Sequence, residues 1–228
     1  VLAWMTEIQE RKMISENETA GVRLKWGNYE GYMRAIDLIV KQPNNFFKAL
    51  AKGVEYASSI YGGSDFALAL GGNEMAGYHT GPAFYTSCLV GSRHGHLDSA
   101  GYDVDHKLIV SGKTPTPEEI AEKLILEEEW RQVLSSLVIC FFGRGVYTPE
   151  VVSKAFSVIG YQLSPEDLMN IGAEILKAKY RFKIREGFSL EKLRIPNKIF
   201  ELETPMGMVT EDFIRSSIEF FKKKLESI

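Results

Sequence analysis

The chain has 228 residues, enough for one large domain or two small ones. Its hydrophobic fraction of 45% and charged fraction of 25% are those of an ordinary globular protein, and its net charge of -3 excludes a general attraction to nucleic acid or anionic lipid. Two cysteines are too few for a disulfide framework, and the longest apolar run, 133–142, is too short to cross a bilayer, so we expect a cytoplasmic protein.

Apolar residues recur at helical spacing from the first residues onwards. Leu2, Met5 and Ile8 lie on one face of a helix predicted over residues 1–13. No start signal precedes this pattern, so we expect a fragment of a longer protein. The apolar face of the helix would then lack its partner, and the fragment is expected to dimerise or aggregate.

Two further helices are predicted before residue 62. A loop over 17–31 leads into a helix over 29–41, which ends before Pro43 because the residue before a proline avoids the α region. A third helix is predicted over 46–61. Its apolar side comprises Phe47, Leu50, Val54 and Ala57.

The composition changes over residues 62–112, which hold 10 of the 20 glycines. Helical periodicity is lost there. Glycine lets the backbone adopt positive φ and approach a ligand closely. We therefore expect an irregular segment, either with a functional role or as a set of ordinary surface loops.

Beyond residue 112, one helix-start signal occurs three times. In it a hydroxyl side chain caps free N–H groups, proline at the first helical position loses no bond, and acids face the positive end of the helix. The predicted helices run to about 139, 160 and 185, and Thr210 starts a last one that ends near 225. The fold class is therefore mainly α. The three signals are Thr116-Pro117-Glu118, Thr148-Pro149-Glu150 and Ser164-Pro165-Glu166.

All four histidines fall within residues 79–106, and two of them belong to the stretch G-S-R-H-G-H-L-D that begins at Gly91. His94 and His96 point to opposite faces in an extended backbone, but they can converge in a bent loop. A zinc site needs three or four ligands, and no third ligand has a suitable spacing. A mononuclear metal site remains an alternative to ordinary polar contacts within a loop. A small zinc hydrolase that uses His94 and His96 is a separate alternative, and it is the one that lacks a third ligand. Further ligands for such a site would come from Asp98, Asp103, Asp105 and His106.

Cys140 ends the apolar segment S-S-L-V-I-C. One interpretation is a buried, structural cysteine near a helix end. The other is one ligand of an iron–sulfur cluster. Such a cluster usually needs four thiolates, so Cys88 and Cys140 cannot hold it alone.

Seven segments together resemble a known family in their order and spacing. They are W-M-T-E-I-Q-E-R-K-M-I from Trp4, V-R-L-K-W-G-N-Y-E from Val22, F-F-K-A-L-A-K-G-V from Phe46, G-Y-H-T-G-P-A from Gly77, S-R-H-G-H-L-D-S-A-G-Y from Ser92, S-S-L-V-I-C from Ser135 and R-F-K-I-R-E-G-F from Arg181. The chain resembles the C-terminal part of the aldehyde:ferredoxin oxidoreductases, the tungsten- or molybdenum-pterin enzymes. The resemblance extends over nearly the whole chain.

This resemblance implies that residues 1–62 are the trailing part of a middle helical domain and that residues 63–228 form the C-terminal helical domain. It implies oxidation of an aldehyde to a carboxylic acid, with a tungsten or molybdenum bis-pterin, a 4Fe-4S cluster and ferredoxin as the electron acceptor. The N-terminal part would supply a pterin-binding domain and a C-x-x-C-x-x-x-C run. This chain alone is therefore expected to bind no cofactor, to be inactive, and to need that missing part as a partner. A homodimer is a further assembly that the resemblance leaves open.

The resemblance also assigns roles to individual residues. Cys140 matches the fourth cysteine of the cluster. A histidine of the R-H-x-H-L segment is expected to lie beside the metal–pterin site, with His96 as the first choice and His94 as the second. A neutral imidazole there would donate to, or accept from, the aldehyde or an oxygen bound to the metal. Arg93 offers fixed donors to a pterin phosphate or a carboxylate product. The full set of expected cofactor-binding residues is Arg93, Asp98, Ser135 and Arg185.

Ser135 departs from the family pattern, which has an aspartate at this position that accepts pterin hydrogen bonds. A serine keeps one acceptor but carries no charge. The alternative function is therefore a degenerate, non-catalytic helical module for binding or assembly with the same fold.

Overall fold

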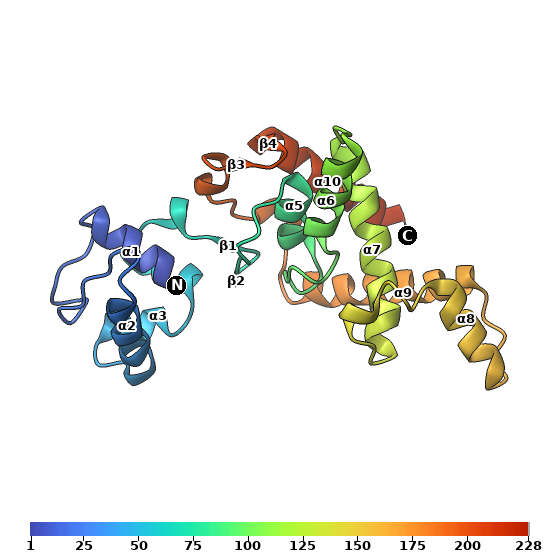
Figure 1. Ribbon diagram of the computed structural model, residues 1–228, viewed down its shortest axis with the longest axis horizontal. Helices are drawn as coiled ribbons and strands as arrows, with labels where there is room; N and C mark the ends of the chain where they lie inside the picture. Colours follow the sequence, from blue (N-terminus) through green and yellow to red (C-terminus); the bar gives the residue numbers. More distant parts are fainter. Residues whose placement is uncertain (228) are drawn as a thin grey trace. The chain divides into compact units, whose positions relative to one another are not determined.

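A computed structural model describes residues 1–227 (Figure 1). This part of the chain is mainly α, as predicted, with two small antiparallel hairpins, β1–β2 and β3–β4. None of its helices is long and apolar enough to cross a membrane. The α-helices are α1 (Leu2–Glu10), α2 (Tyr29–Lys41), α3 (Asn45–Leu50), α4 (Val54–Tyr61), α5 (Pro82–Val90), α6 (Gly101–Ser111), α7 (Pro117–Ser136), α8 (Pro149–Val158), α9 (Pro165–Arg185) and α10 (Glu211–Ser227). The 3-10 helices are η1 (Ser64–Phe66), η2 (Phe141–Gly143), η3 (Leu190–Lys192) and η4 (Asn197–Phe200), and the strands are β1 (Ala69–Leu70), β2 (Asn73–Glu74), β3 (Glu203–Thr204) and β4 (Gly207–Met208).

The chain divides into two compact units. Unit 1 comprises Val1–Met75 and Arg194–Glu201, and unit 2 comprises Ala76–Leu193 and the chain from Leu202 onwards. The division differs from the boundary predicted after residue 62. Arg194 provides the reason, because its guanidinium donates to the carbonyl groups of Ser64 and Ala69 and forms an ion pair with Glu55. These long-range bonds attach residues 63–75 and residues 194–201 to unit 1. No local sequence signal assigns either segment to that unit.

The apolar face of α1 is buried in the core of unit 1. Trp4, Met5 and Ile8 are at most 3% exposed, and the Trp4 ring stacks on Phe46 with 6.4 Å between ring centroids. The expectation that this face lacks a partner was therefore wrong. The core that it joins is formed by residues from later in the chain, and α3 and α4 contribute to it.

The helix predicted over 46–61 is interrupted and forms α3 and α4. The interruption lies at Gly53, whose φ of +97° strongly favours glycine. The N–H of Val54 donates to the carboxylate of Glu74 at 2.8 Å, which satisfies a free donor at the start of α4. The predicted apolar side is buried on both helices.

Two helices, α5 and α6, lie inside the stretch predicted to be irregular. Every residue of α5 is buried, so no amphipathic periodicity marks it in the sequence. Asp105 on α6 accepts hydrogen bonds from the N–H groups of Ala83 and Phe84, at 3.0 and 2.9 Å, and thereby caps α5. Burial raises the pKa of Asp105 to about 6. The prediction of an irregular segment was thus wrong for these residues.

The helix starts predicted after residue 112 are confirmed. Thr116 and Ser164 each form a reciprocal capping box with the acid three residues later. The helix α7 packs against α5, α6, α9 and α10 and is the centre of unit 2. It is therefore the scaffold on which the histidine-rich loop rests.

Candidate functional site

The loop Gly91–Asp98 joins α5 to α6 and folds back on itself. A Cβ atom at Gly91 would lie 2.8 Å from the Ser87 carbonyl oxygen and 2.9 Å from an Asp98 carboxylate oxygen, so no larger residue fits. His94 adopts a left-handed φ of +55°, which is uncommon for a residue with a side chain. The loop is therefore bent and not extended. A bent loop is the condition under which the side chains of His94 and His96 were expected to be able to converge.

Asp98 holds this bend together. Its carboxylate is 1% exposed and accepts hydrogen bonds from the N–H groups of Arg93 and Gly95, both at 2.9 Å. The Arg93 side chain adds a bond from Nε at 2.7 Å and an ion pair through Nη2 at 2.7 Å. Both residues were expected to bind cofactor. In this structure they bind each other, although the Arg93 side chain remains half exposed.

His94 has both ring nitrogens engaged. Nδ1 lies 3.2 Å from the Cys88 carbonyl oxygen, and Nε2 lies 3.0 Å from Nζ of Lys183 on α9. Burial and the charge of Lys183 both lower the pKa of His94. Burial also lowers the pKa of Lys183 to about 8. The contacts fit a neutral imidazole that donates from Nδ1 and accepts at Nε2.

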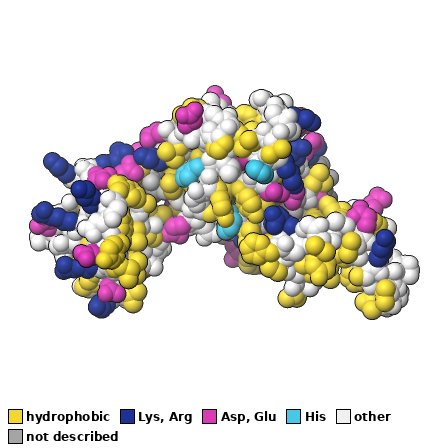
Figure 2. Space-filling model, in the orientation of Figure 1, with side chains coloured by type: hydrophobic (Ala, Val, Ile, Leu, Met, Phe, Trp, Pro, Cys, Tyr) yellow, Lys and Arg dark blue, Asp and Glu magenta, His cyan; other side chains and the backbone are white. Residues whose placement is uncertain are grey.

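The surroundings of His96 differ from those of His94. Its half-buried ring lies beside the rings of Tyr78 and Tyr102, with centroid distances of 5.5 and 6.3 Å. Within residues 1–227 no hydrogen bond occupies its nitrogens. Figure 2 shows histidine side chains reaching the visible surface of the molecule. His96 is thus the loop histidine with nitrogens available to another molecule.

Glu128 on α7 lies beneath the loop and is fully buried. One carboxylate oxygen accepts from the N–H of Ser92 at 2.8 Å, and the other has no hydrogen-bond partner. Burial, followed by the charge of Asp98, raises the pKa of Glu128 to about 7. The loop therefore rests on a carboxyl group that exchanges a proton near neutral pH.

Replacement of Glu128 by glutamine is expected to stabilise the protein at pH 8. The raised pKa means that the folded state binds this proton more tightly than the unfolded state does, so stability falls as the pH rises from 4.5 to about 7. The full cost, about 3 kcal/mol, is present above pH 7. Glutamine mimics the protonated acid and avoids this cost, so in urea unfolding the advantage of Glu128→Gln should shrink to under about 1 kcal/mol at pH 5. An equal advantage at both pH values would contradict the assignment.

Arg131, one turn further along α7, links this helix to the loop. Its Nη1 donates to the Leu97 carbonyl oxygen at 2.9 Å, while Nε and Nη2 are buried and have no hydrogen-bond partner. Arg131 and Arg144 both line a hollow of about 560 Å³, with Trp130 and Phe142 among the other lining residues. Burial lowers the pKa of Arg131, and the nearby charge of Arg144 lowers it further. Lys107, Asp103 and Glu127 line the same hollow, and a carboxylate oxygen of Glu127 lies 3.8 Å from Nε of Arg131, so the charges around the hollow are mixed.

The other expected site residues lie at helix ends. Ser135 is exposed in the last turn of α7, and Cys140 is an exposed, free thiol at the start of η2. Arg185 is exposed at the end of α9 and pairs with Glu186 at 3.1 Å. Thus the structure joins Arg93, His94 and Asp98 in one loop, whereas Ser135 and Arg185 lie at the ends of α7 and α9, and Cys140 lies at the start of η2.

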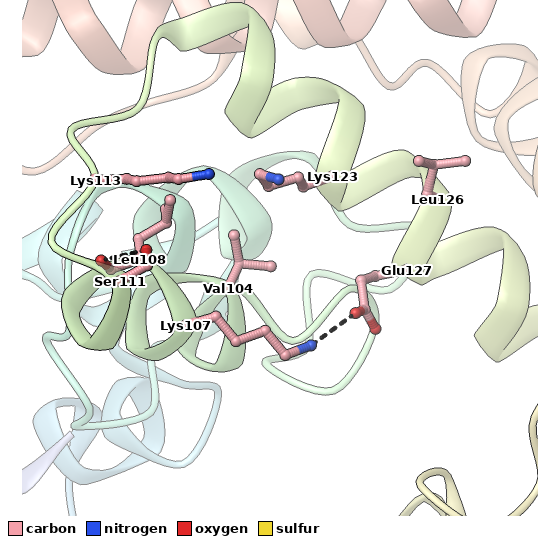
Figure 3. A pocket seen from close by; sticks show the side chains of 8 residues that line it. All are labelled: Val104, Lys107, Leu108, Ser111, Lys113, Lys123, Leu126 and Glu127. Carbon is pink, nitrogen blue, oxygen red and sulfur yellow. Dashed lines mark hydrogen bonds and ion pairs between the residues drawn. The ribbon is translucent and has the colours of Figure 1, made fainter.

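A second, smaller hollow of about 290 Å³ lies between α6 and α7 (Figure 3). Lys113 and Lys123 extend over it from opposite sides, and an ion pair of 3.4 Å between Lys107 and Glu127 borders it. Lys107 and Glu127 also line the larger hollow, so this ion pair separates the two.

Three residues of the site were not predicted from the sequence: Glu128, Arg131 and Lys183. A signal did exist, because Leu124, Glu128 and Arg131 follow at helical spacing and all three are buried. A charged residue within an apolar stripe marks a buried polar contact.

No group of three or more His, Cys, Asp or Glu side chains within residues 1–227 could hold a metal ion. Comparison with protein-family models matches residues 1–226 to the family described as aldehyde ferredoxin oxidoreductase, domains 2 & 3. Comparisons with curated proteins and with solved structures gave no match. Since the family match covers nearly the whole chain, this protein belongs to the aldehyde ferredoxin oxidoreductase family.

Proposed function

We propose that this chain is the C-terminal portion of a tungsten- or molybdenum-pterin, iron–sulfur enzyme that oxidises an aldehyde to a carboxylic acid and passes the electrons to ferredoxin. Family membership supports the class of reaction. The placement of Cys140 carries the proposal for this chain. Its thiol is exposed and free just beyond α7, the helix whose Arg131 binds the histidine loop.

Cys140 fits one ligand position of an iron–sulfur cluster, because an accessible thiol can be deprotonated and bind iron. Cys88 does not fit, since it is buried and burial raises the pKa of its thiol to about 12. The other thiolates would therefore come from the part of the protein that precedes this chain. The exposed Ser135 would offer the pterin one hydroxyl where the family has a carboxylate.

The metal–pterin centre, when bound, would accept the two electrons of the oxidation, and the cluster would pass them on singly. Conversion of R–CHO and water to R–COOH also releases two protons, so a base is needed near the reacting carbon. His96 suits this role because its nitrogens are available. His94 would act as a support, since Lys183 and the Cys88 carbonyl hold its ring.

The second candidate function is the non-catalytic helical module, and Ser135 favours it. A serine offers the pterin fewer acceptors than an aspartate does. The two functions differ in metal content, because the module would contain neither a cluster nor tungsten or molybdenum.

Metal analysis of the intact protein, purified without oxygen, tests the proposal. We expect iron together with tungsten or molybdenum, and we expect Cys140→Ala to lose the electron paramagnetic resonance signal of the reduced cluster. Cys88→Ala is the matched control and should keep that signal. Iron without tungsten or molybdenum would refute the pterin centre, and a protein free of all three metals would favour the module.

A further inference from the structure

Lys183 on α9 is a half-buried lysine whose direct contacts are with neutral groups. Its Nζ lies 3.2 Å from the carbonyl oxygen of Gly91 and 3.0 Å from Nε2 of His94. The rings of Tyr180 and Phe188 also lie against it, with 4.9 and 3.8 Å between Nζ and the ring centroids. Within residues 1–227 no carboxylate forms an ion pair with Lys183. An ammonium group without a paired anion, in partly apolar surroundings, loses its proton more readily than an exposed one.

Charges at longer range offset this effect only in part. Glu128 on α7 and Asp98 in the loop both favour the charged form of Lys183. Burial acts in the opposite direction and is the larger effect, so the pKa of Lys183 falls to about 8. At pH 7.5 about a quarter of Lys183 is then the free amine, against about 0.1% of an ordinary lysine.

We propose that Lys183 is a carbonyl-capture site, at which the amine forms an imine with a small aldehyde or ketone. A desolvated lysine amine is the form that reacts with carbonyl compounds. The side chain is half-buried and not fully enclosed, so a small molecule can reach it. The site goes beyond the proposed oxidation, because imine formation needs neither a metal nor an electron acceptor.

The contact between Lys183 and His94 supplies the proton transfers of this reaction. Nζ attacks the carbonyl carbon and a C–N bond forms, while Nε2 of His94 accepts a proton from Nζ and passes it to the carbonyl oxygen. Transfer of the second amine proton by the same route lets the oxygen leave as water, and the C=N bond forms. One carbonyl compound and one amine thus give one imine and one water, without oxidation or reduction.

Capture of a carbonyl compound would loosen the histidine loop. The ammonium group has three donors, of which the Gly91 carbonyl and His94 take two. A neutral imine nitrogen has no donor and a protonated one has a single donor. At least one of the two bonds must therefore break, so the adduct weakens the support that α9 gives to the loop.

Reductive trapping of the intact protein with acetone and sodium cyanoborohydride at pH 7.5 tests the proposal. Acetone is the probe because a ketone cannot be oxidised to a carboxylic acid, so the result does not depend on the oxidoreductase activity. Cyanoborohydride converts the imine to a stable amine with one isopropyl group, which mass spectrometry of peptides locates. We expect Lys183 to react at least about tenfold faster than Lys177, a control lysine on the same helix that is also half-buried but pairs with Glu174 at 3.5 Å.

The pH dependence of trapping provides a second measurement. The fraction of free amine rises about tenfold per pH unit below the pKa and is nearly constant above it. The rate at Lys183 should therefore level off above about pH 8. At an ordinary lysine it keeps rising up to about pH 10.4.

Three variants test the groups around Lys183, and circular dichroism verifies that each remains folded. Lys183→Arg keeps a cation but cannot form an imine, so the fast-reacting site should disappear. Glu128→Gln removes a charge that favours the ammonium form and should raise the rate at Lys183 by about two- to fourfold at pH 7.5. His94→Gln keeps an acceptor but cannot carry a proton, and it should lower the rate by about tenfold or more.

The outcomes that would overturn the proposal are distinct for each part of it. Equal rates at Lys183 and Lys177, a rate at Lys183 that keeps rising beyond pH 9, or a Glu128→Gln protein that reacts no faster would each refute the capture site. An unchanged rate in His94→Gln would refute the role of His94 as the proton carrier.

Discussion

Replacement of His96 by alanine in the intact, metal-loaded enzyme is expected to lower kcat for aldehyde oxidation by roughly 100-fold or more. His96 is the loop histidine whose nitrogens are available. Its ring lies beside the rings of Tyr78 and Tyr102, whereas hydrogen bonds hold the ring of His94. Removal of His96 deletes the proposed proton acceptor but no hydrogen bond that holds the loop. Steady-state kinetics with a set of aldehydes, together with metal analysis, would measure the effect, and the metal content should not change.

Two other histidines provide the controls. His106→Ala, at an exposed position on α6, should leave kcat unchanged. His94→Ala removes the contacts to Lys183 and to the Cys88 carbonyl, so it should lower the stability of the loop as well as the activity. Normal turnover by His96→Ala, with loss of turnover in a well-folded His94→Ala enzyme, would reverse the assignment of the two roles.

The sequence located the loop but could not rank its two histidines from the chain itself. Gly91–Asp98 is rich in polar residues, which is a local property, and the chemistry of His94 and His96 is the same in isolation. What separates them is a lysine 89 residues after His94, on α9, and a carbonyl group on α5. Such partners depend on tertiary packing, which sequence periodicity does not encode.

The difference between local signals and tertiary contacts also explains which helices could be predicted. The starts of α7, α8 and α9 were found because their signals are local. A hydroxyl side chain accepts from an N–H group three residues later, and the proline between them lacks an N–H that would otherwise be unpaired. The helix α5 was missed because it is buried on every side, so its sequence shows no polar face. The interruption between α3 and α4 was missed because the glutamate that caps α4, Glu74, comes 20 residues later.

Buried charges were the least predictable part of the site. Glu128 stands among three consecutive glutamates, of which it is the most deeply buried. Its burial follows from the positions of α9 and of the loop around α7. The resemblance to the family predicts which residues bind cofactor, and that prediction does not extend to Glu128 and Lys183, which contact the loop. The helical spacing of Leu124, Glu128 and Arg131 marks a charge on the buried face of α7, but the partners of Glu128 and Lys183 emerge only when the helices are placed together.

Replacement of Gly172 by alanine is expected to destabilise unit 2 by about 1–3 kcal/mol. In an exposed helix this change is worth about 1 kcal/mol in the opposite direction, because alanine favours helix more than glycine does. Gly172, however, lies where α9 meets α7, and a Cβ atom there would lie 2.2 Å from the carbonyl oxygen of Glu129. That oxygen belongs to the backbone of α7, so it cannot rotate away as a side chain can. The two helices must separate.

Separation of α7 and α9 also reaches the histidine loop. Lys183 on α9 holds Nε2 of His94, and Glu128 on α7 supports Ser92, so both contacts depend on the spacing of these helices. Urea unfolding of Gly172→Ala should therefore show a lower midpoint, and the pKa of His94, followed by nuclear magnetic resonance, should rise as the Lys183 charge moves away. Asn170→Ala, at an exposed position two residues earlier on α9, is the control and should be as stable as the parent chain or slightly more so. If Gly172→Ala gained stability in the same way, the close approach of α7 and α9 would be refuted, and with it the dependence of the loop on their spacing.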